Sequence, residues 1–185
     1  FASGRGGSFN IWKIPSGGGE PQQITAGQGD DADLSLSADG TRMVFSTYRQ
    51  NISIGIADLN GKGQTAGLKW LTSDAARGEL GPAYSPDGKH IAYFSNRKGV
   101  EREGIWVMEA DGSNPAPLVV DDYTNVFPRW YADGKALLFR SSLARLGTAG
   151  DRIRRVAISG GPAEVVVPAP FGISADVDSQ GRVVG

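Results

Sequence analysis

The feature that most constrains this chain of 185 residues is an internal repeat of about 47 residues. One series of turns ends at Gly40, Gly88, Gly134 and Gly181, which are separated by 48, 46 and 47 residues. A second series of apolar segments ends at Thr25, Thr72, Val119 and Val166, each 47 residues after the one before. Two independent series with one period indicate four copies of one structural unit, and missing such a repeat would misassign the whole fold.

Each repeat contains four short apolar segments. In residues 73–119 they are Pro82 to Tyr84, Ile91 to Phe94, Ile105 to Met108 and a segment that ends at Val119. An Asp-Gly pair between the first two segments is a strong hairpin signal, because Gly tolerates positive φ, and it predicts a primed turn. Glycine-rich pairs punctuate the third-to-fourth connection in the same way. The unit is therefore predicted to be a four-stranded antiparallel meander.

The second segments distinguish between architectures. Ile91 to Phe94 and Ala136 to Phe139 are apolar at consecutive positions, whereas a half-buried strand would alternate apolar and polar residues. Four small sheets that are each covered on both faces by like sheets describe blades around an axis. A β-sandwich would show alternation, and a parallel β-helix would need a much shorter period. The sequence therefore predicts an all-β fold, a β-propeller of four-stranded antiparallel blades.

The repeats predict a single domain over residues 1–185. Its blades are 26–72, 73–119 and 120–167, and residues 1–25 form a blade that residues 172–185 complete. Phe1 matches Tyr93 and Phe139, so it occupies the position that a residue after Gly185 would take. Three arrangements follow: a fragment of a propeller with about six to eight blades, two copies closed head to tail into an eight-bladed ring, or one copy closed as four blades.

Composition argues against several classes of function. The net charge is −1 and Lys and Arg are scattered, so no basic footprint indicates nucleic acid. No apolar run approaches the ~18 residues that a membrane helix needs, so no membrane insertion is expected. The absence of Cys removes disulfides, thiol nucleophiles and thiolate metal sites. It leaves the compartment open, with the bacterial periplasm preferred.

Two stretches of the second repeat carry a resemblance to a known family. Residues 82–95 read Pro-Ala-Tyr-Ser-Pro-Asp-Gly-Lys-His-Ile-Ala-Tyr-Phe-Ser, and residues 104–113 read Gly-Ile-Trp-Val-Met-Glu-Ala-Asp-Gly-Ser. They resemble the WD-like propeller repeat of the TolB family. That repeat also occurs in propellers of prolyl-oligopeptidase-type hydrolases, bacterial Ser/Thr kinases and winged-helix regulators. The resemblance covers all four repeats and is sharpest here, since Ala38, Tyr131 and Gln180 depart from the motif.

The resemblance implies that the Asp-Gly turn joins the innermost strand of a blade to the second strand. The strands nearest the central channel would then start at Leu34, Pro82, Pro128 and Ala175. Trp12, Trp106 and Trp130 would fill space between blades. The repeat is specific for the fold and nearly silent on function, because propellers host many unrelated activities.

The sequence offers no catalytic constellation. No window reads Gly-x-Ser-x-Gly, and the one histidine, His90, occupies a hairpin position expected to be exposed. A single His without Cys excludes the usual zinc ligand sets. Gly4 to Gly7 and Gly17 to Gly19 lack a following helix or Gly-Lys-Ser/Thr, so they predict turns and not phosphate loops. We therefore expect no catalytic, cofactor or metal site, and no enzyme activity in this chain.

Five polar residues are the candidates for a binding site. Asp31, Glu79 and Asn125 are equivalent positions just before the innermost strands, while Arg129 and Asp176 share a later position and are candidates to pair across blades. Together they would surround one mouth of the channel and bind a cation, a small ligand or a peptide terminus. The acidic residues near Asp31 lack the order of an EF-hand loop. We favour the alternative that these side chains satisfy backbone groups at strand ends.

The connections between second and third strands are the other candidates for contacts. They are Arg49 to Ser53, Arg97 to Glu103 and Leu143 to Arg152, and such loops on a rigid scaffold are where partners usually bind. The leading hypothesis is a non-catalytic propeller, a scaffold or sensor module that binds a protein or peptide partner. The alternative is part of the substrate-gating propeller of a prolyl-oligopeptidase-type hydrolase, whose catalytic domain would lie outside this chain.

Overall fold

The computed structural model describes residues 1–6, 8–26, 29–48, 52–59, 65–72, 78–96, 103–143, 150–168, 176–178 and 182–184. All regular secondary structure in these ranges is β-strand, as predicted. The strands are β1 (Ala2–Gly6), β2 (Ser8–Lys13), β3 (Gln22–Gln23), β4 (Asp30–Leu36), β5 (Arg42–Tyr48), β6 (Ile52–Leu59), β7 (Thr65–Trp70), β8 (Glu79–Tyr84), β9 (His90–Ser95), β10 (Gly104–Glu109), β11 (Ala116–Val119), β12 (Thr124–Trp130), β13 (Ala136–Ser142), β14 (Arg152–Ala157), β15 (Glu164–Val167), β16 (Asp176–Val177) and β17 (Val183–Val184). Within these ranges no helix is long and apolar enough to cross a membrane.

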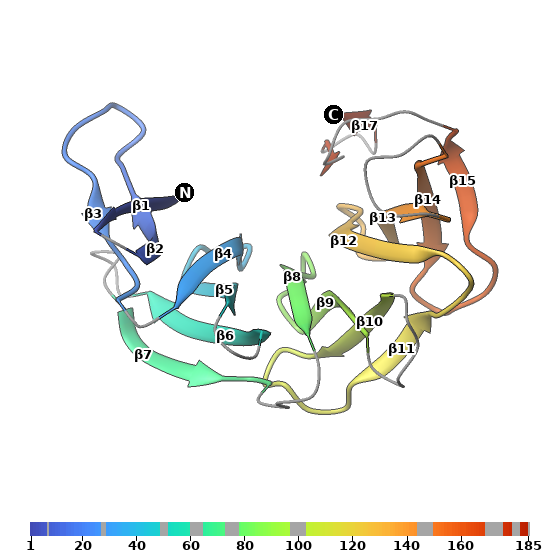
Figure 1. Ribbon diagram of the computed structural model, residues 1–185, viewed down its shortest axis with the longest axis horizontal. Helices are drawn as coiled ribbons and strands as arrows, with labels where there is room; N and C mark the ends of the chain where they lie inside the picture. Colours follow the sequence, from blue (N-terminus) through green and yellow to red (C-terminus); the bar gives the residue numbers. More distant parts are fainter. Residues whose placement is uncertain are drawn as a thin grey trace.

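Three complete sheets follow the predicted meander. Their strand orders are β4-β5-β6-β7, β8-β9-β10-β11 and β12-β13-β14-β15, and neighbouring strands pair antiparallel. Figure 1 shows the sheets along an arc, with β4, β8 and β12 on its inner side and β7, β11 and β15 on its outer side. The innermost-to-second turns and the third-to-fourth connections lie at one end of each sheet, here called the turn end. The starts of the inner strands and the second-to-third connections lie at the opposite end, the loop end.

Two smaller sheets lie at the ends of the arc. β1, β2 and β3 form a three-stranded sheet, and β16 pairs only with β17. Figure 1 shows these sheets on opposite sides of the opening of the arc. The described strands of one copy therefore do not join into a closed four-bladed ring. The assignment of residues 1–25 and 172–185 to a single blade stays a prediction.

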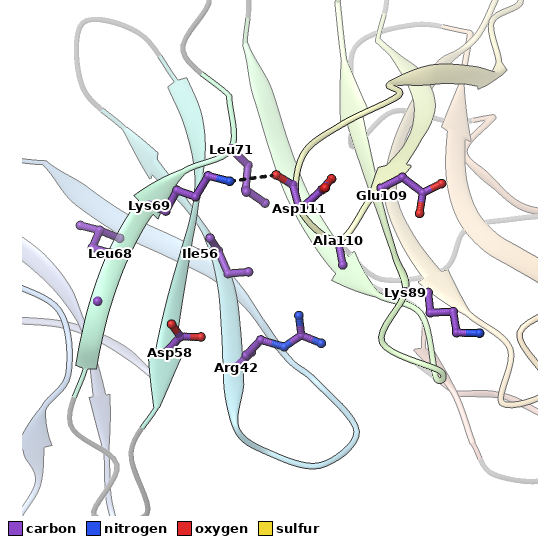
Figure 2. A pocket seen from close by; sticks show the side chains of 11 residues that line it. Arg42, Ile56, Asp58, Leu68, Lys69, Leu71, Lys89, Glu109, Ala110 and Asp111 are labelled. Carbon is purple, nitrogen blue, oxygen red and sulfur yellow. Dashed lines mark hydrogen bonds between the residues drawn. The ribbon is translucent and has the colours of Figure 1, made fainter.

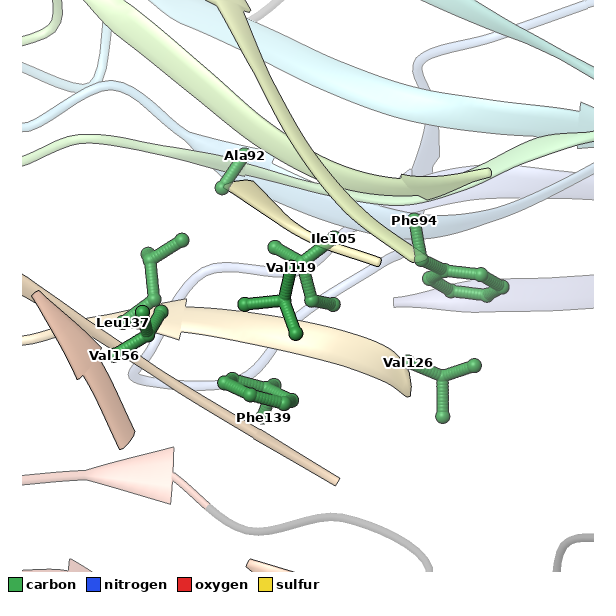
Figure 3. Packing of buried hydrophobic residues seen from close by; sticks show 8 residues of the cluster. All are labelled: Ala92, Phe94, Ile105, Val119, Val126, Leu137, Phe139 and Val156. Atoms are coloured by element: carbon green, nitrogen blue, oxygen red, sulfur yellow. The ribbon is translucent and has the colours of Figure 1, made fainter. Parts of the chain in front are cut away.

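The hydrophobic core is divided into clusters that lie between neighbouring sheets. Figure 3 shows one of them, to which β8–β11 and β12–β15 each contribute four side chains: Ala92, Phe94, Ile105, Val119, Val126, Leu137, Phe139 and Val156. A second cluster joins β4–β7 to β8–β11, and a third joins β2 to β4–β7. The second strands β5, β9 and β13 are buried along nearly their whole length, and β5 and β9 each contribute side chains to the clusters on both of their faces. Their consecutive apolar residues were the correct signal for stacked blades.

Hydrogen bonds within the motif itself hold the Asp-Gly turns. The Ser85 hydroxyl donates to Asp87 Oδ1 at 2.6 Å and accepts from the His90 N–H at 2.9 Å, while Gly88 N–H donates to the Ser85 carbonyl at 2.9 Å. These contacts, led by the Ser85 hydroxyl, hold the pKa of Asp87 below its usual value. The predicted primed turn is wrong. Positive φ is confined to the glycine, 68° at Gly88, because the preceding Asp caps the turn with its side chain instead of entering the left-handed region.

The glycine-rich segment near the N-terminus also differs from its prediction. Gly4 and Gly6 belong to strand β1 instead of forming a turn, and Gly6 pairs with Ser8 across the connection to β2. Gly18 and Gly19 have φ of 87° and 129° and form the expected turn, in which Gly18 N–H donates to the Pro15 carbonyl at 2.9 Å.

Candidate functional site

Three of the predicted site residues lie at the loop end of adjacent inner strands. Asp31, Glu79 and Asn125 face Thr47, Ser95 and Ser141 of the second strands in the same ladder position. The Thr47 hydroxyl donates to Asp31 Oδ1 and the Ser141 hydroxyl donates to Asn125 Oδ1, both at 2.5 Å. The exposed fractions of Asp31, Glu79 and Asn125 are only 6%, 2% and 0%. They were expected just before the strands, but they lie inside them and their side chains are buried.

A β-bulge follows each of these polar residues. The register shifts between Ala32 and Ser35 in β4, and β8 and β12 shift at the equivalent place. The residue two positions after the polar one has positive φ in every case: 52° at Asp33, 58° at Gly81 and 55° at Phe127. Such a conformation is uncommon for a residue with a side chain and costs backbone energy, which bulges beside functional sites often store.

Side chains from the second strands hold the bulges. The Tyr48 hydroxyl donates to Asp33 Oδ2 at 2.7 Å, and the Phe127 ring packs edge-on against Phe94 with centroids 5.3 Å apart. Burial, and then the bond to Asp33, raise the pKa of Tyr48. Gly81 N–H donates to the Ser46 hydroxyl of the preceding sheet at 3.1 Å. The bulges therefore tie neighbouring sheets together near the channel.

The other two predicted site residues, Arg129 and Asp176, are described in less detail by the structure. Arg129 is half-buried in β12, and its Nη1 donates to the Pro128 carbonyl at 3.0 Å. Asp176 begins β16, and its side chain lies outside the described part of the chain. The expected pairing of Arg129 with Asp176 stays a prediction.

A buried arginine beside Asn125 is a feature that the sequence reasoning missed. Arg154 Nη1 donates to Asp121 Oδ2 at 2.7 Å and lies 3.4 Å from the Ser141 hydroxyl. Its guanidinium lies 4.9 Å from the centre of the Tyr123 ring. Burial opposes ionisation of Asp121, but hydrogen bonds from Asn125 and Arg154 outweigh it and lower the pKa of Asp121. The pair attaches the segment before β12 to β14.

The repeat itself contained a signal for this arginine. Ladder partners show that Arg154 occupies the position held by Trp12 and Trp106 in other sheets. At the fourth equivalent, Gly55, the Trp70 ring fills the space, since a Cβ built on Gly55 would lie 2.9 Å from it. Each of these four sheets thus fills the same position with a flat group, an indole in three sheets and a guanidinium in the fourth.

A second buried ion pair lies at the loop end of the same sheet. Arg140 and Asp151 form it, with exposed fractions of 5% and 4%. Such a pair contributes little net stability, but removing one partner would leave a buried charge. Two cationic side chains are therefore fixed at the loop end of β12–β15, where they order the strand ends.

A groove lies near the turn end between β4–β7 and β8–β11. Its volume is about 610 Å³, and Figure 2 shows Ile56, Leu71 and Ala110 along its floor. The charged side chains around it are Arg42, Asp58, Lys69, Lys89, Glu109 and Asp111. Lys69 Nζ donates to the Asp111 carbonyl oxygen at 3.3 Å and so bridges the two sheets. A groove of about 630 Å³ occupies the corresponding place between the N-terminal sheet and β4–β7.

No catalytic or metal-binding arrangement is found within the described ranges. His90 is half-buried, with Nε2 3.8 Å from Glu109 Oε2 and its ring tilted against Trp130 at 6.5 Å, and none of the described serine hydroxyls bonds to its ring. None of the described His, Asp and Glu residues form a group of three that could hold a metal ion. Of the three connections predicted to contact partners, positions 49–51, 97–102 and 144–149 lie outside the described residues.

The three meander sheets, stacked face to face around a common centre with their inner strands toward it, define a β-propeller. Two of the solved structures that it resembles are described as TolB. A TolB candidate from Agrobacterium tumefaciens matches with a TM-score of 0.74 and 26% identity over 87% of this chain and 57% of its own. TolB from Acinetobacter baumannii matches with a TM-score of 0.74 and 18% identity over 94% of this chain and 41% of its own, which shows the fold alone. The chain is a TolB-like β-propeller.

Sequence relatives point to two kinds of protein. An uncharacterised protein of Agrobacterium fabrum is 30% identical over 143 residues, 73% of this chain and 44% of its own length. The uncharacterised peptidase YuxL of Bacillus subtilis is 26% identical over 142 residues, 72% of this chain and 20% of its own length. TolB of Anaeromyxobacter dehalogenans is 41% identical over 54 residues, 29% of this chain and 12% of its own. The chain thus spans less than half of each relative, and no protein-family model matches it.

Proposed function

We propose that this chain is a non-catalytic propeller scaffold that binds a protein or peptide partner at the loop end of its sheets. The observation that carries the proposal is the stack of complete sheets, whose interfaces are filled by buried apolar clusters. Such a stack keeps the inner-strand ends and the connections between strands in a constant geometry, and rigidly displayed loops commonly carry binding. The similarity to the 26% identical TolB candidate supports a scaffold of this kind.

Asp31, Glu79, Asn125, Arg129 and Asp176 remain the proposed residues of the channel mouth. Their repetition at the loop end supports the proposal. Because Asp31, Glu79 and Asn125 are buried, we propose that they act on binding through the backbone that they support and not by touching the partner. They would hold the bulges at Asp33, Gly81 and Phe127 beside the channel, so that the partner contacts the bulges and connections. Calorimetry with Ca²⁺ and Mg²⁺ tests whether these residues bind a cation directly. An absence of binding heat would exclude direct cation binding.

Site-specific photo-crosslinking tests the scaffold proposal. A benzophenone side chain at Leu143, an exposed position directly after β13 at the loop end, should yield a discrete adduct with a protein or peptide in the native cell. The same group at Lys135, in the turn end of β12–β15, is the control and should yield much less of that adduct. An adduct at neither position, or an equal yield at both, would contradict partner binding at the loop end.

The alternative function is part of the substrate-gating propeller of a prolyl-oligopeptidase-type hydrolase. The similarity to the peptidase YuxL over 142 residues favours it. In that case this chain would filter substrates by access to the channel, and residues outside it would perform the chemistry. The gene that encodes the chain discriminates between the two functions. An α/β-hydrolase segment after the propeller selects the alternative, whereas a kinase or winged-helix segment before it selects the sensor module.

The ring closure that we propose is a head-to-tail pair of copies. Among the described strands, the sheets β1–β3 and β16–β17 each have an edge with no further partner, and pairing protects such edges from other association. Light scattering on the purified chain tests the proposal. A dimer supports an eight-bladed ring, and a clean monomer contradicts it.

A further inference from the structure

Comparison of equivalent positions in the sheets distinguishes one arginine at the loop end. The ladder partners of the second-strand Ser or Thr occupy the same position in four third strands, and they are Asn10, Ser53, Gly104 and Arg152. Of these four described sheets, only β12–β15 places a charged side chain there. Because the other three sheets form without one, the blade fold does not require an arginine at this position. Arg152 is therefore a candidate for a role in binding.

Arg152 continues the row of polar residues at the channel mouth. Its ladder partner is Ser141, which in turn faces the predicted site residue Asn125 on the inner strand. The row therefore runs at the loop end from the first strand of the sheet to the third. Asn125 is fully buried, whereas Arg152 is partly exposed, so a partner at the loop end can reach it.

The guanidinium of Arg152 is held in place by an aromatic ring. It lies 5.0 Å from the centre of the Tyr123 ring, and the guanidinium of Arg154 lies 4.9 Å from the same centre. Tyr123 is itself fixed, because its N–H donates to Asp121 Oδ1 at 3.1 Å and its carbonyl accepts from Asn125 Nδ2 at 3.1 Å. A guanidinium that is stacked in this way loses little conformational freedom when it binds a ligand.

The hydrogen bonds of this guanidinium are few and long. Arg152 Nε lies 3.4 Å from the Gly150 carbonyl oxygen, and Nη1 lies 3.4 Å from the Tyr123 hydroxyl oxygen. Both distances exceed the roughly 2.7–3.2 Å of a good N–H···O bond. Nη2 makes no hydrogen bond within the described ranges. Most of the donor capacity of the Arg152 guanidinium is therefore unused.

Ion pairing separates Arg152 from the other arginines at this end of the sheet. Each of the others has a carboxylate partner, in the pairs Arg140–Asp151 and Arg154–Asp121. Among the described residues Arg152 forms no ion pair, and the exposed Asp122 is no exception. A fixed planar guanidinium with unused N–H groups matches the two oxygens of a carboxylate. Because the neighbouring arginines are already neutralised, a carboxylate suits the position better than a more highly charged phosphate.

We propose that Arg152 binds a carboxylate of the partner, supplied by an Asp or Glu side chain or by the C-terminus of a peptide. The inference rests on the proposed function, binding of a protein or peptide at the loop end, and names the chemistry of one contact. The carboxylate accepts hydrogen bonds from Nη1 and Nη2 while the Tyr123 ring supports one face of the guanidinium. An uncharged carboxamide cannot form this paired contact and should bind more weakly.

Nuclear magnetic resonance on the ¹⁵N-labelled chain tests this with three acetylated peptides. Gly-Ser-Glu-Ser-Gly-amide carries the carboxylate on a side chain, Gly-Ser-Gln-Ser-Gly with a free C-terminus carries it at the end, and Gly-Ser-Gln-Ser-Gly-amide carries none. We expect saturable shifts of the Arg152 Nε–H and Tyr123 amide signals with at least one carboxylate peptide. Its affinity should be at least about fivefold higher than that of the peptide without a carboxylate. The peptide that binds identifies the source of the carboxylate.

Variants of the arginine test its part in the contact. Arg152→Gln should remove the preference for a carboxylate, and Arg152→Lys should retain about half of it or less, because an ammonium lacks the planar fork. Arg155→Gln is the matched control, since Arg155 is exposed on the same strand and stacks on Tyr131 at 5.4 Å, nearer the turn end. It should leave the preference unchanged. If Arg152→Gln fails to fold, the peptide comparison on the unaltered chain still decides, because the Arg152 Nε–H signal reports the contact directly.

Several results would overturn the inference: no saturable shifts, equal affinity for the three peptides, shifts that leave Arg152 unaffected, or a full preference in Arg152→Gln. The cross-linking experiment at Leu143 separates such a failure from a failure of the proposed function. If only the inference fails, the adduct forms equally with the unaltered chain and with Arg152→Gln. If the proposed function fails, neither chain yields a discrete adduct.

Discussion

Replacing Gly81 by Ala should destabilise the fold by an amount that the structure allows to be separated into two parts. Gly81 has φ of 58°, a conformation that costs an L-residue with a side chain roughly 1–2 kcal/mol. A Cβ built on Gly81 would also lie 2.6 Å from Phe94 Cε1. The Phe94 ring is itself buried and packs on Phe127, so it must shift within a filled interface, which costs about 1–3 kcal/mol. The expected loss is about 3 kcal/mol.

The matched control is Gly40→Ala. Gly40 has φ of 67° but no atom within 4 Å of a Cβ built on it, so this variant has only the backbone cost. At about 2–4 °C per kcal/mol for a chain of this size, Gly81→Ala should lower Tm by about 6–12 °C. Gly40→Ala should lower it by about half as much or less. Thermal and urea unfolding followed by circular dichroism measure both.

A double variant tests whether the difference comes from the Phe94 contact. Phe94→Leu alone removes ring packing and costs stability. Combined with Gly81→Ala it should cost less than the two single losses added together, because Leu lacks the Cε1 atom that makes the shortest contact and its flexible side chain can move away. Equal losses for Gly81→Ala and Gly40→Ala, or strict additivity with Phe94→Leu, would refute the argument that the bulge requires glycine for space.

Three further outcomes follow from the hydrogen bonds and ion pairs. Arg154→Met should lower the free energy of unfolding in urea by about 2 kcal/mol, because it leaves the partly buried Asp121 carboxylate without its cation. The control Arg155→Met, at an exposed position on the same strand, should lower it by less than about 0.5 kcal/mol. Similar losses for the two variants would contradict this argument. Ser85→Ala should raise the pKa of Asp87 toward its usual value, which a carboxyl-carbon NMR titration would detect, and an unchanged pKa would contradict the turn geometry. The hydrogen bonds around Asp39, led by the Ser37 hydroxyl, lower its pKa from 3.8 to about 2. The stability from its ionised form should be complete above about pH 4 and lost as the pH falls through about 2, and Asp39→Asn should remove that part of the pH dependence of the urea midpoint.

The blade and its repetition were predictable because they depend on local patterns. The Ser-Pro-Asp87-Gly88 segment forms its turn with hydrogen bonds inside the motif, so no distant partner is needed to specify the hairpin. Consecutive apolar residues in β9 and β13 indicate burial on both faces whatever the covering element is. The same alignment placed Asp31, Glu79 and Asn125 at one repeat position, which the structure brings to the loop end of neighbouring strands.

The sequence alone determined that this protein is built of four-stranded blades and where each blade turns. Tertiary structure alone decided the bulge at Gly81, the pairing of Arg154 with Asp121 and the groove lined by Ala110. Each of these depends on a side chain from another strand or sheet: Phe94 against the bulge, Asp121 against the arginine, and Ile56 below the groove. A periodic pattern tells which positions are covered, but the space left to a residue is set by how neighbouring sheets stack, and residues far apart in the chain determine that stacking.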